Sequence, residues 1–169
     1  MDGPPDKSPK GYFDTSPYLK LVIDKDGRWF QNGSEIVHPL VYLQFCQMLE
    51  KTENGEYRVR LGREVCRVEV MDAPFVIKSV SERAGELFIH LNDKSVEPFN
   101  PELFWIGEGN VPYSLIKSGA FHARFLRPAY YQLVQYIESD RQEKEFYITI
   151  KGKRWRIPIY SSSLSSDGD

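Results

Sequence analysis

Short runs of alternating apolar and polar residues dominate the chain and predict a protein built mostly of β-strands. Residues 56–61 alternate cleanly and residues 65–70 less regularly, and Gly62 between them indicates a hairpin. Residues 75–80 and 87–91 predict a second hairpin by the same pattern. The middle of the chain is therefore expected to form a sheet.

Two stretches instead space their apolar residues as a helix does, and a proline opens each of them. The first helix is predicted over residues 39–51, and the second begins at Pro128. A shift of 89 positions lays Pro39 on Pro128 and the hairpin after the first helix on residues 146–159. Both halves thus show the order strand, glycine turn, strand, X-Pro, helix, hairpin, which predicts two related units.

Length and composition fit this architecture. The chain has 169 residues, of which 41% are hydrophobic and 14% aromatic, so it can bury a sizeable core. We predict an α+β fold of two related units, each a curved, mostly antiparallel sheet with one helix, spanning residues 17–95 and 96–160. Residues 1–16 and 161–169 are rich in Pro, Gly, Ser and charge and are expected to be a disordered leader and tail.

The charge balance excludes some partners. A net charge of −2 and an isoelectric point near 6.0 argue against broad attraction to nucleic acid or to anionic membranes. No stretch has the roughly 18 apolar residues of a membrane span, and the first residues do not read as a secretory signal. Cys46 and Cys66 form no CxxC motif, so we expect reduced thiols in a cytoplasmic protein.

No catalytic signature is found. His38, His90 and His122 are scattered and lack the spacing of metal ligands. Residues 107–109 read Gly-Glu-Gly but lack the lysine and the strand-to-helix context of a phosphate loop. We therefore expect no metal, no cofactor, no catalytic residues and no enzymatic activity.

Several motifs of the chain resemble a known family. In the first half they are Asp26-Gly27-x-Trp29-Phe30-x-x-Gly33-x-x-Ile36-x-x-Pro39, Asp72-Ala73-Pro74-Phe75 and Asn92-Asp93-x-x-Val96. In the second half they are Pro112-Tyr113-x-Leu115, Lys117-x-Gly119, Ala123-Arg124 and Tyr131-x-Leu133-Val134. Together they are similar to the pattern of bacterial domain-of-unknown-function family 1285 (DUF1285) over about residues 20 to 160. His38 departs from it, since an arginine is expected before Pro39, and the hairpin at residues 151–159 matches only loosely.

The resemblance implies a duplicated α+β core whose C-terminal half is superficially like a pleckstrin-homology fold. It also implies a ligand cleft between the halves for a nucleotide-like molecule and a role in signalling, and it carries no activity. We accordingly predict a non-enzymatic intracellular binding or sensing module. The alternative is a protein-interaction module that binds a peptide or a signalling partner protein in the same cleft. The residues expected to bind the ligand are Trp29, Asp72, Asn92, Asp93, Tyr113, Lys117 and Arg124.

Two interpretations remain open for several of these residues. Asp72 either bonds nearby backbone N–H groups to fix its turn or faces the cleft. Arg124 either clamps a phosphate or pairs with a structural carboxylate. Trp29 and Phe30 lie on opposite faces of a strand, and we expect Phe30 to pack in the scaffold and Trp29 to stack on the ligand. For the basic run at residues 151–156 a solvated hairpin is favoured over a nucleic-acid contact.

Overall fold

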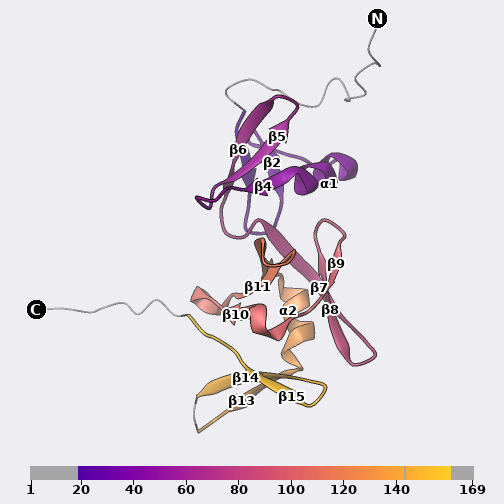
Figure 1. The fold of residues 1–169 in the computed structure, drawn as a ribbon, viewed down its shortest axis with the longest axis vertical. Coiled ribbons are helices and arrows are strands. Elements are labelled where there is room, and N and C mark those ends of the chain that lie inside the picture. The colour runs from indigo at the N-terminus through magenta and orange to yellow at the C-terminus, as the bar shows by residue number, and fades with distance from the viewer. Residues whose placement is uncertain (1–18, 143, 161–169) are drawn as a thin grey trace, which may run out of the picture.

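The computed structural model describes residues 19–142 and 144–160, which form two α-helices and three β-sheets of an α+β fold (Figure 1). The predicted leader and tail lie outside the described residues. In chain order the elements are β1 (Leu21–Ile23), β2 (Trp29–Gln31), β3 (Ser34–Glu35), α1 (Pro39–Met48), β4 (Leu49–Lys51), β5 (Tyr57–Leu61), β6 (Glu64–Val70), β7 (Phe75–Arg83), β8 (Glu86–Leu91), β9 (Val96–Pro98), β10 (Phe104–Ile106), β11 (Pro112–Ile116), β12 (Phe121–Phe125), α2 (Arg127–Val134), β13 (Ile137–Asp140), β14 (Glu145–Ile150) and β15 (Lys153–Arg156). Two short 3-10 turns are η1 (Pro101–Leu103) and η2 (Glu108–Asn110).

The first sheet and α1 form the upper body in Figure 1. The strand order of this sheet is β3-β2-β1-β6-β5-β4. Its neighbouring strands are antiparallel except β1 and β6, which run parallel with Leu21 opposite Val68. The predicted hairpin around Gly62 is thus confirmed as β5 and β6.

The second sheet has the order β10-β11-β12-β7-β8-β9, and β13-β14-β15 form a small third sheet. The pairing of β12 with β7 is parallel, with Arg124 opposite Val76. Helix α2 packs against β7. The α+β class is confirmed, and the mixed, curled sheets are compatible with two related units. The strands of the second half, however, are divided between two sheets rather than gathered in one.

Sheet membership changes between β6 and β7, at residues 71–74. The unit boundary expected from the sequence, at residues 95 and 96, lies between β8 and β9, which pair with each other in the second sheet. Independent folding of either unit stays a prediction.

The observed helix bounds differ slightly from the predicted ones. Helix α1 begins at Pro39 as predicted but ends at Met48. The next three residues form β4, where Leu49 pairs with Val59, so ladder hydrogen bonds replace the last helical turn. Helix α2 begins at Arg127, one residue before Pro128, and ends at Val134.

Aromatic rings fill much of the core. The Trp29 ring lies 5.3 Å from that of Phe45 on α1, and both side chains are fully buried. In the second sheet, Phe99, Phe104 and Phe125 pack edge to face. Both cysteines are free thiols, with Cys46 buried and Cys66 half-buried. Burial, together with the nearby charge of Asp93, raises the pKa of the Cys46 thiol to about 12.

Gly27 offers a test of how closely the two larger sheets are packed together. Its φ is +76°, and a Cβ there would lie 2.8 Å from a methyl carbon of Val76 on β7. Gly27→Ala is expected to lower the free energy of unfolding by about 1–2 kcal/mol through backbone strain and by about 1–3 kcal/mol more through overpacking. Urea denaturation measures the loss.

Gly55→Ala is the matched control, because Gly55 has a φ of +81° and open space around its would-be Cβ. Only the backbone strain applies to this variant. Equal losses for Gly27→Ala and Gly55→Ala would contradict the close contact between the two sheets.

Candidate ligand-binding site at the junction of the two larger sheets

Three of the predicted site residues meet at the segment that joins β6 to β7. The Tyr113 hydroxyl donates to the Asp72 carboxylate, at 2.8 Å from Oδ1 and 3.0 Å from Oδ2. The Arg124 guanidinium donates to Asp72 Oδ2 at 2.9 Å. About a quarter of each side chain of this ion pair is exposed, 26% for Arg124 and 24% for Asp72. Asp72 is therefore bonded by side chains of the second sheet, and Arg124 pairs with a structural carboxylate in this structure.

Aromatic side chains lie beside this ion pair. The Trp105 ring stacks beside the Tyr113 ring with centroids 5.6 Å apart, and the His122 ring lies 6.2 Å from Tyr113. Burial, and then the hydrogen bond to Asp72, raise the pKa of Tyr113 to about 12. We call Asp72, Trp105, Tyr113, His122 and Arg124 the Asp72 cluster.

Burial within the Asp72 cluster favours the neutral form of His122. Its Nε2 lies 3.3 Å from the Asp72 carbonyl oxygen. Burial lowers the pKa of His122, and the bond to that carbonyl only partly opposes the shift. Near neutral pH the ring can thus face a ligand without adding a charge.

A second group of predicted residues surrounds Asp93, in the turn between β8 and β9. Lys117 Nζ lies 2.7 Å from Asp93 Oδ2, and the Ser95 backbone N–H and hydroxyl both donate to Oδ1. The Lys117 backbone N–H donates to the carboxylate of Glu97 at 2.9 Å. Burial acts to raise the pKa of Asp93, but the bonds from Lys117 and Ser95 outweigh it, so the pKa is lowered.

Asn92 connects the second sheet to α1. Its Oδ1 accepts from the Val76 N–H at 3.1 Å, and its Nδ2 donates to the Tyr42 hydroxyl at 2.6 Å. That hydroxyl in turn donates to the Gly27 carbonyl at 2.7 Å. Val76 on β7 also pairs with Arg124 on the neighbouring strand β12. Strand β7 therefore runs between the Asp72 cluster and Asn92.

Trp29 requires a correction. It is 0% exposed and packs on Phe45, so it offers no face on which a ligand could stack. Phe30, for which we predicted a scaffold role, is the partly exposed member of the pair and lies under the Arg28 guanidinium at 5.7 Å. Alternation placed the two rings on opposite faces correctly, and the core lies on the Trp29 face, where α1 packs through Phe45.

Two members of the Asp72 cluster were not predicted from the sequence. Trp105 belongs to none of the motifs singled out above, and His122 is named there only as one of three scattered histidines. The period-two pattern could have found His122, because it shares a strand face with Arg124 two positions away. Trp105 on β10 lies opposite Tyr113 on β11. Turn-forming residues flank the short strand β10 on both sides, so the pattern of apolar residues does not predict it.

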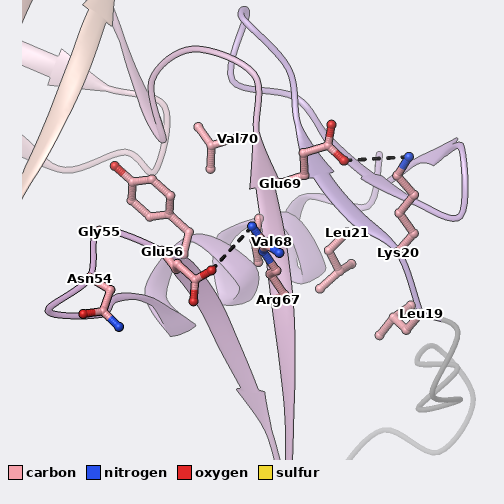
Figure 2. A pocket seen from close by; sticks show the side chains of 11 residues that line it. Leu19, Lys20, Leu21, Asn54, Gly55, Glu56, Arg67, Val68, Glu69 and Val70 are labelled. Atoms are coloured by element: carbon pink, nitrogen blue, oxygen red, sulfur yellow. Dashed lines mark ion pairs between the residues drawn. The ribbon is translucent and has the colours of Figure 1, made fainter.

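Hollows also occur on the first sheet. One of about 670 Å³ lies beside β6. The side chains that line it, drawn in Figure 2, come from β1 and the two residues before it, from β5 and the turn before it, and from β6. Exposed ion pairs cross it, Lys20 with Glu69 at 3.7 Å and Arg67 with Glu56 at 3.5 Å. These charges neutralise one another, so the hollow shows no preference for one sign of ligand.

The basic hairpin at residues 151–156 has its cations largely engaged. The Arg154 guanidinium lies 3.7 Å over the Tyr147 ring, and Lys153 Nζ lies 4.8 Å over Trp155. Lys151 Nζ is 2.9 Å from Glu86, and Arg156 is 2.7 Å from Glu145. This arrangement fits the solvated hairpin favoured from the sequence.

Residues 19–142 and 144–160 contain no group of three or more His, Cys, Asp or Glu side chains placed to hold a metal ion. None of the helices they form is long and apolar enough to cross a membrane.

Two solved structures share this fold. A DUF1285 family protein from Silicibacter pomeroyi DSS-3 superposes with a TM-score of 0.67 at 19% identity, covering 83% of this chain and 80% of its own. A DUF1285 family protein from Shewanella baltica OS155 gives a TM-score of 0.57 at 21% identity, covering 70% of this chain and 92% of its own. No family model matches the sequence, and no curated protein matches it. The resemblance to DUF1285 proteins and the α+β class expected from it are thus confirmed, whereas the pleckstrin-homology-like character of the C-terminal half stays a prediction.

The bonds to Asp93 predict an acid-sensitive contribution to stability. Its carboxylate side chain is 8% exposed and its pKa is lowered on folding. The contribution is therefore present above the unfolded pKa of about 3.9 and is lost as the pH falls through the lower folded pKa. Asp93→Asn should reduce the free energy of unfolding by about 1–3 kcal/mol at pH 7 and by much less at pH 2.5. Urea denaturation at the two pH values measures the difference.

Asp26→Asn is the control, because the Asp26 side chain is 49% exposed and pairs with Arg28 only at 3.8 Å. Its loss should stay below about 0.5 kcal/mol at both pH values. A loss in Asp93→Asn that does not change with pH would show that the charge of Asp93 does not stabilise the fold.

Proposed function

We propose that the protein is a non-enzymatic binding or sensing module that takes up a nucleotide-like small molecule at the Asp72 cluster. A role in signalling and a cytoplasmic location belong to the same proposal. The observation that carries it is the partly exposed guanidinium of Arg124 beside the rings of Trp105, Tyr113 and His122.

The chemistry of these groups suits an aromatic ligand that carries an anion. A guanidinium has five N–H donors, and among the described residues that of Arg124 donates only to the Asp72 carboxylate. Its remaining donors can form the planar fork that binds phosphate oxygens. The neighbouring indole, phenol and imidazole rings provide surfaces on which a base stacks.

The cluster also holds its groups in place before a ligand arrives. Asp72 fixes both the Arg124 guanidinium and the Tyr113 hydroxyl, so less side-chain freedom is lost on binding. The Asp72 carboxylate repels an anion placed directly on it, which directs a phosphate to the side of the guanidinium away from Asp72.

Mono-, di- and cyclic nucleotides, screened by thermal shift on the full chain, test this proposal. A ligand at a hundredfold excess over its Kd adds about 2.7 kcal/mol to stability, which a thermal shift detects easily. Arg124→Lys should weaken binding of a phosphate-bearing hit about tenfold, because an ammonium cannot form the fork. Trp105→Leu should weaken it about fivefold or more through loss of stacking.

Tyr131→Leu is the matched aromatic control, since Tyr131 is 66% exposed on α2 and lies outside the Asp72 cluster. It should leave nucleotide binding unchanged. Folding of each variant is checked by near-ultraviolet circular dichroism. The proposal fails if no nucleotide stabilises the protein, or if folded Arg124→Lys and Trp105→Leu bind as tightly as the parent.

A further inference from the structure

The strand pairings of the first half recur in the second half. Ile23 pairs with Trp29 and, in parallel, with Val70. Ile106 pairs in the same way with Pro112 and Ile159. Strands β10, β11 and β12 thus take the places of β1, β2 and β3.

This correspondence sets Arg124 in the place of Glu35. Glu35 lies opposite Phe30 in the β2–β3 ladder, and Arg124 lies opposite Tyr113 in the β11–β12 ladder. The outer faces of the two halves therefore share an aromatic ring beside a charged residue, but the sign of that charge is opposite.

The two halves differ at the next position in the sheet. In the second half, β7 lies parallel to β12, with Ala123, Arg124 and Phe125 opposite Phe75, Val76 and Ile77. In the first half, β3 is the last strand of its sheet, and no strand of residues 19–142 or 144–160 pairs with its outer side. The place that β7 occupies beside β12 has no occupant beside β3.

The open side of β3 presents backbone hydrogen-bonding groups. The Ile36 N–H bonds inward to the Trp29 carbonyl at 2.8 Å. Because backbone groups alternate along a strand, the N–H and C=O of Glu35 point outward. In the second half the outward side of β12 serves β7: Arg124, the counterpart of Glu35, pairs with Val76, and two residues further on the Leu126 N–H bonds to the Ile77 carbonyl at 3.0 Å.

A hollow of about 420 Å³ lies along this open edge, and β3 and the start of α1 line it. Val37 and Val41 are among its lining residues, and Val37 is 75% exposed. The edge therefore combines free backbone groups with apolar surface, as strand-binding grooves of other proteins do.

Helix α2 contacts β7, and α1 carries a glutamine at the matching position. Gln132 on α2 accepts a hydrogen bond from the Val80 N–H of β7 at 2.7 Å. Within the helices the correspondence is one residue shorter than the shift of 89 that relates Glu35 to Arg124: the N-caps His38 and Leu126 are 88 positions apart, as are the fully buried Phe45 and Leu133. This shift of 88 places Gln44 in the position of Gln132. Gln44 is exposed, and it can meet an incoming strand as Gln132 meets β7.

We propose that β3 and α1 bind an extended peptide of a partner protein, which adds to the first sheet as a strand parallel to β3. The peptide carries apolar residues like the Phe-Val-Ile of β7. It also carries a lysine or arginine four positions before the residue that pairs with Glu35. In the second half, Val76 pairs with Arg124, and Asp72, four positions before Val76, bonds to Arg124. Because Glu35 has the opposite charge to Arg124, the peptide needs a basic residue at the position of Asp72. This site is separate from the Asp72 cluster and does not depend on the proposed function.

Arg28 lies near Glu35, and the charge of Glu35 helps to raise the pKa of Arg28, although the bond that Arg28 donates to Asp24 is the largest cause. The Arg28 guanidinium is bonded to Asp24 at 2.8 Å. Glu35 thus keeps a carboxylate with which a basic residue of the peptide can pair.

The probe is a fluorescein-labelled peptide of residues 71–83 of this chain, made in its natural form and with Asp72→Lys. Fluorescence anisotropy with the full chain should show saturable 1:1 binding, about threefold to fivefold tighter for the Asp72→Lys peptide. Glu35→Lys in the protein should reverse this preference. Gln44→Ala should weaken both peptides about threefold, since a backbone N–H of the peptide loses its acceptor.

Val37→Glu should weaken binding about tenfold or more, because it places a charge in the apolar hollow. Val65→Glu is its control, as Val65 is a 49% exposed valine on β6 at a distance from β3 in the strand order. The proposal is overturned if neither peptide binds, if Val37→Glu and Val65→Glu bind alike, or if Glu35→Lys leaves the preference unchanged. A homodimer in sedimentation that Val37→Glu dissociates would also overturn it, in favour of a second copy at this edge.

Discussion

Hydrogen bonds through the amide side chain of Asn92 fix how the two larger sheets dock against each other. It bonds the Val76 backbone on one side and the Tyr42 hydroxyl on the other, and Tyr42 continues to the Gly27 carbonyl. Four parts of the chain, namely the β1–β2 turn, α1, β7 and the β8–β9 turn, are thereby joined by one chain of hydrogen bonds. Because Gly27 has no side chain, its turn can approach Val76 closely enough for these bonds to form.

This junction also determines the chemistry of the candidate site. Asp72 lies in the short link between the two sheets, so the position of its carboxylate depends on how they are docked. Tyr113 and Arg124 then bond to that carboxylate, and the guanidinium is oriented next to the aromatic rings. The charged groups are mutually paired yet partly exposed, a combination that supports the fold and leaves donors for a ligand.

One recurring arrangement produces two different surfaces. In the second half β7 covers the edge of β12, and α2 packs on it. In the first half the corresponding edge of β3 ends the sheet. The strand that follows the first sheet in the chain, β7, pairs with β12 in the second sheet. The outer edge of β3 is therefore left without a paired strand among residues 19–142 and 144–160.

Local chemistry was readable from the sequence alone. Glycine turns, X-Pro helix starts and period-two alternation predicted the α+β class, the two helices and the main hairpins, because each depends on neighbouring residues only. The site was found in part: Asp72, Tyr113 and Arg124 were singled out individually, although they are 41 and 52 positions apart. That these three bond to one another was decided by the docking of the sheets. The burial of Trp29 was likewise a tertiary result, because alternation assigns Trp29 and Phe30 to opposite faces, and only the packing of Phe45 on α1 decides which face is the core.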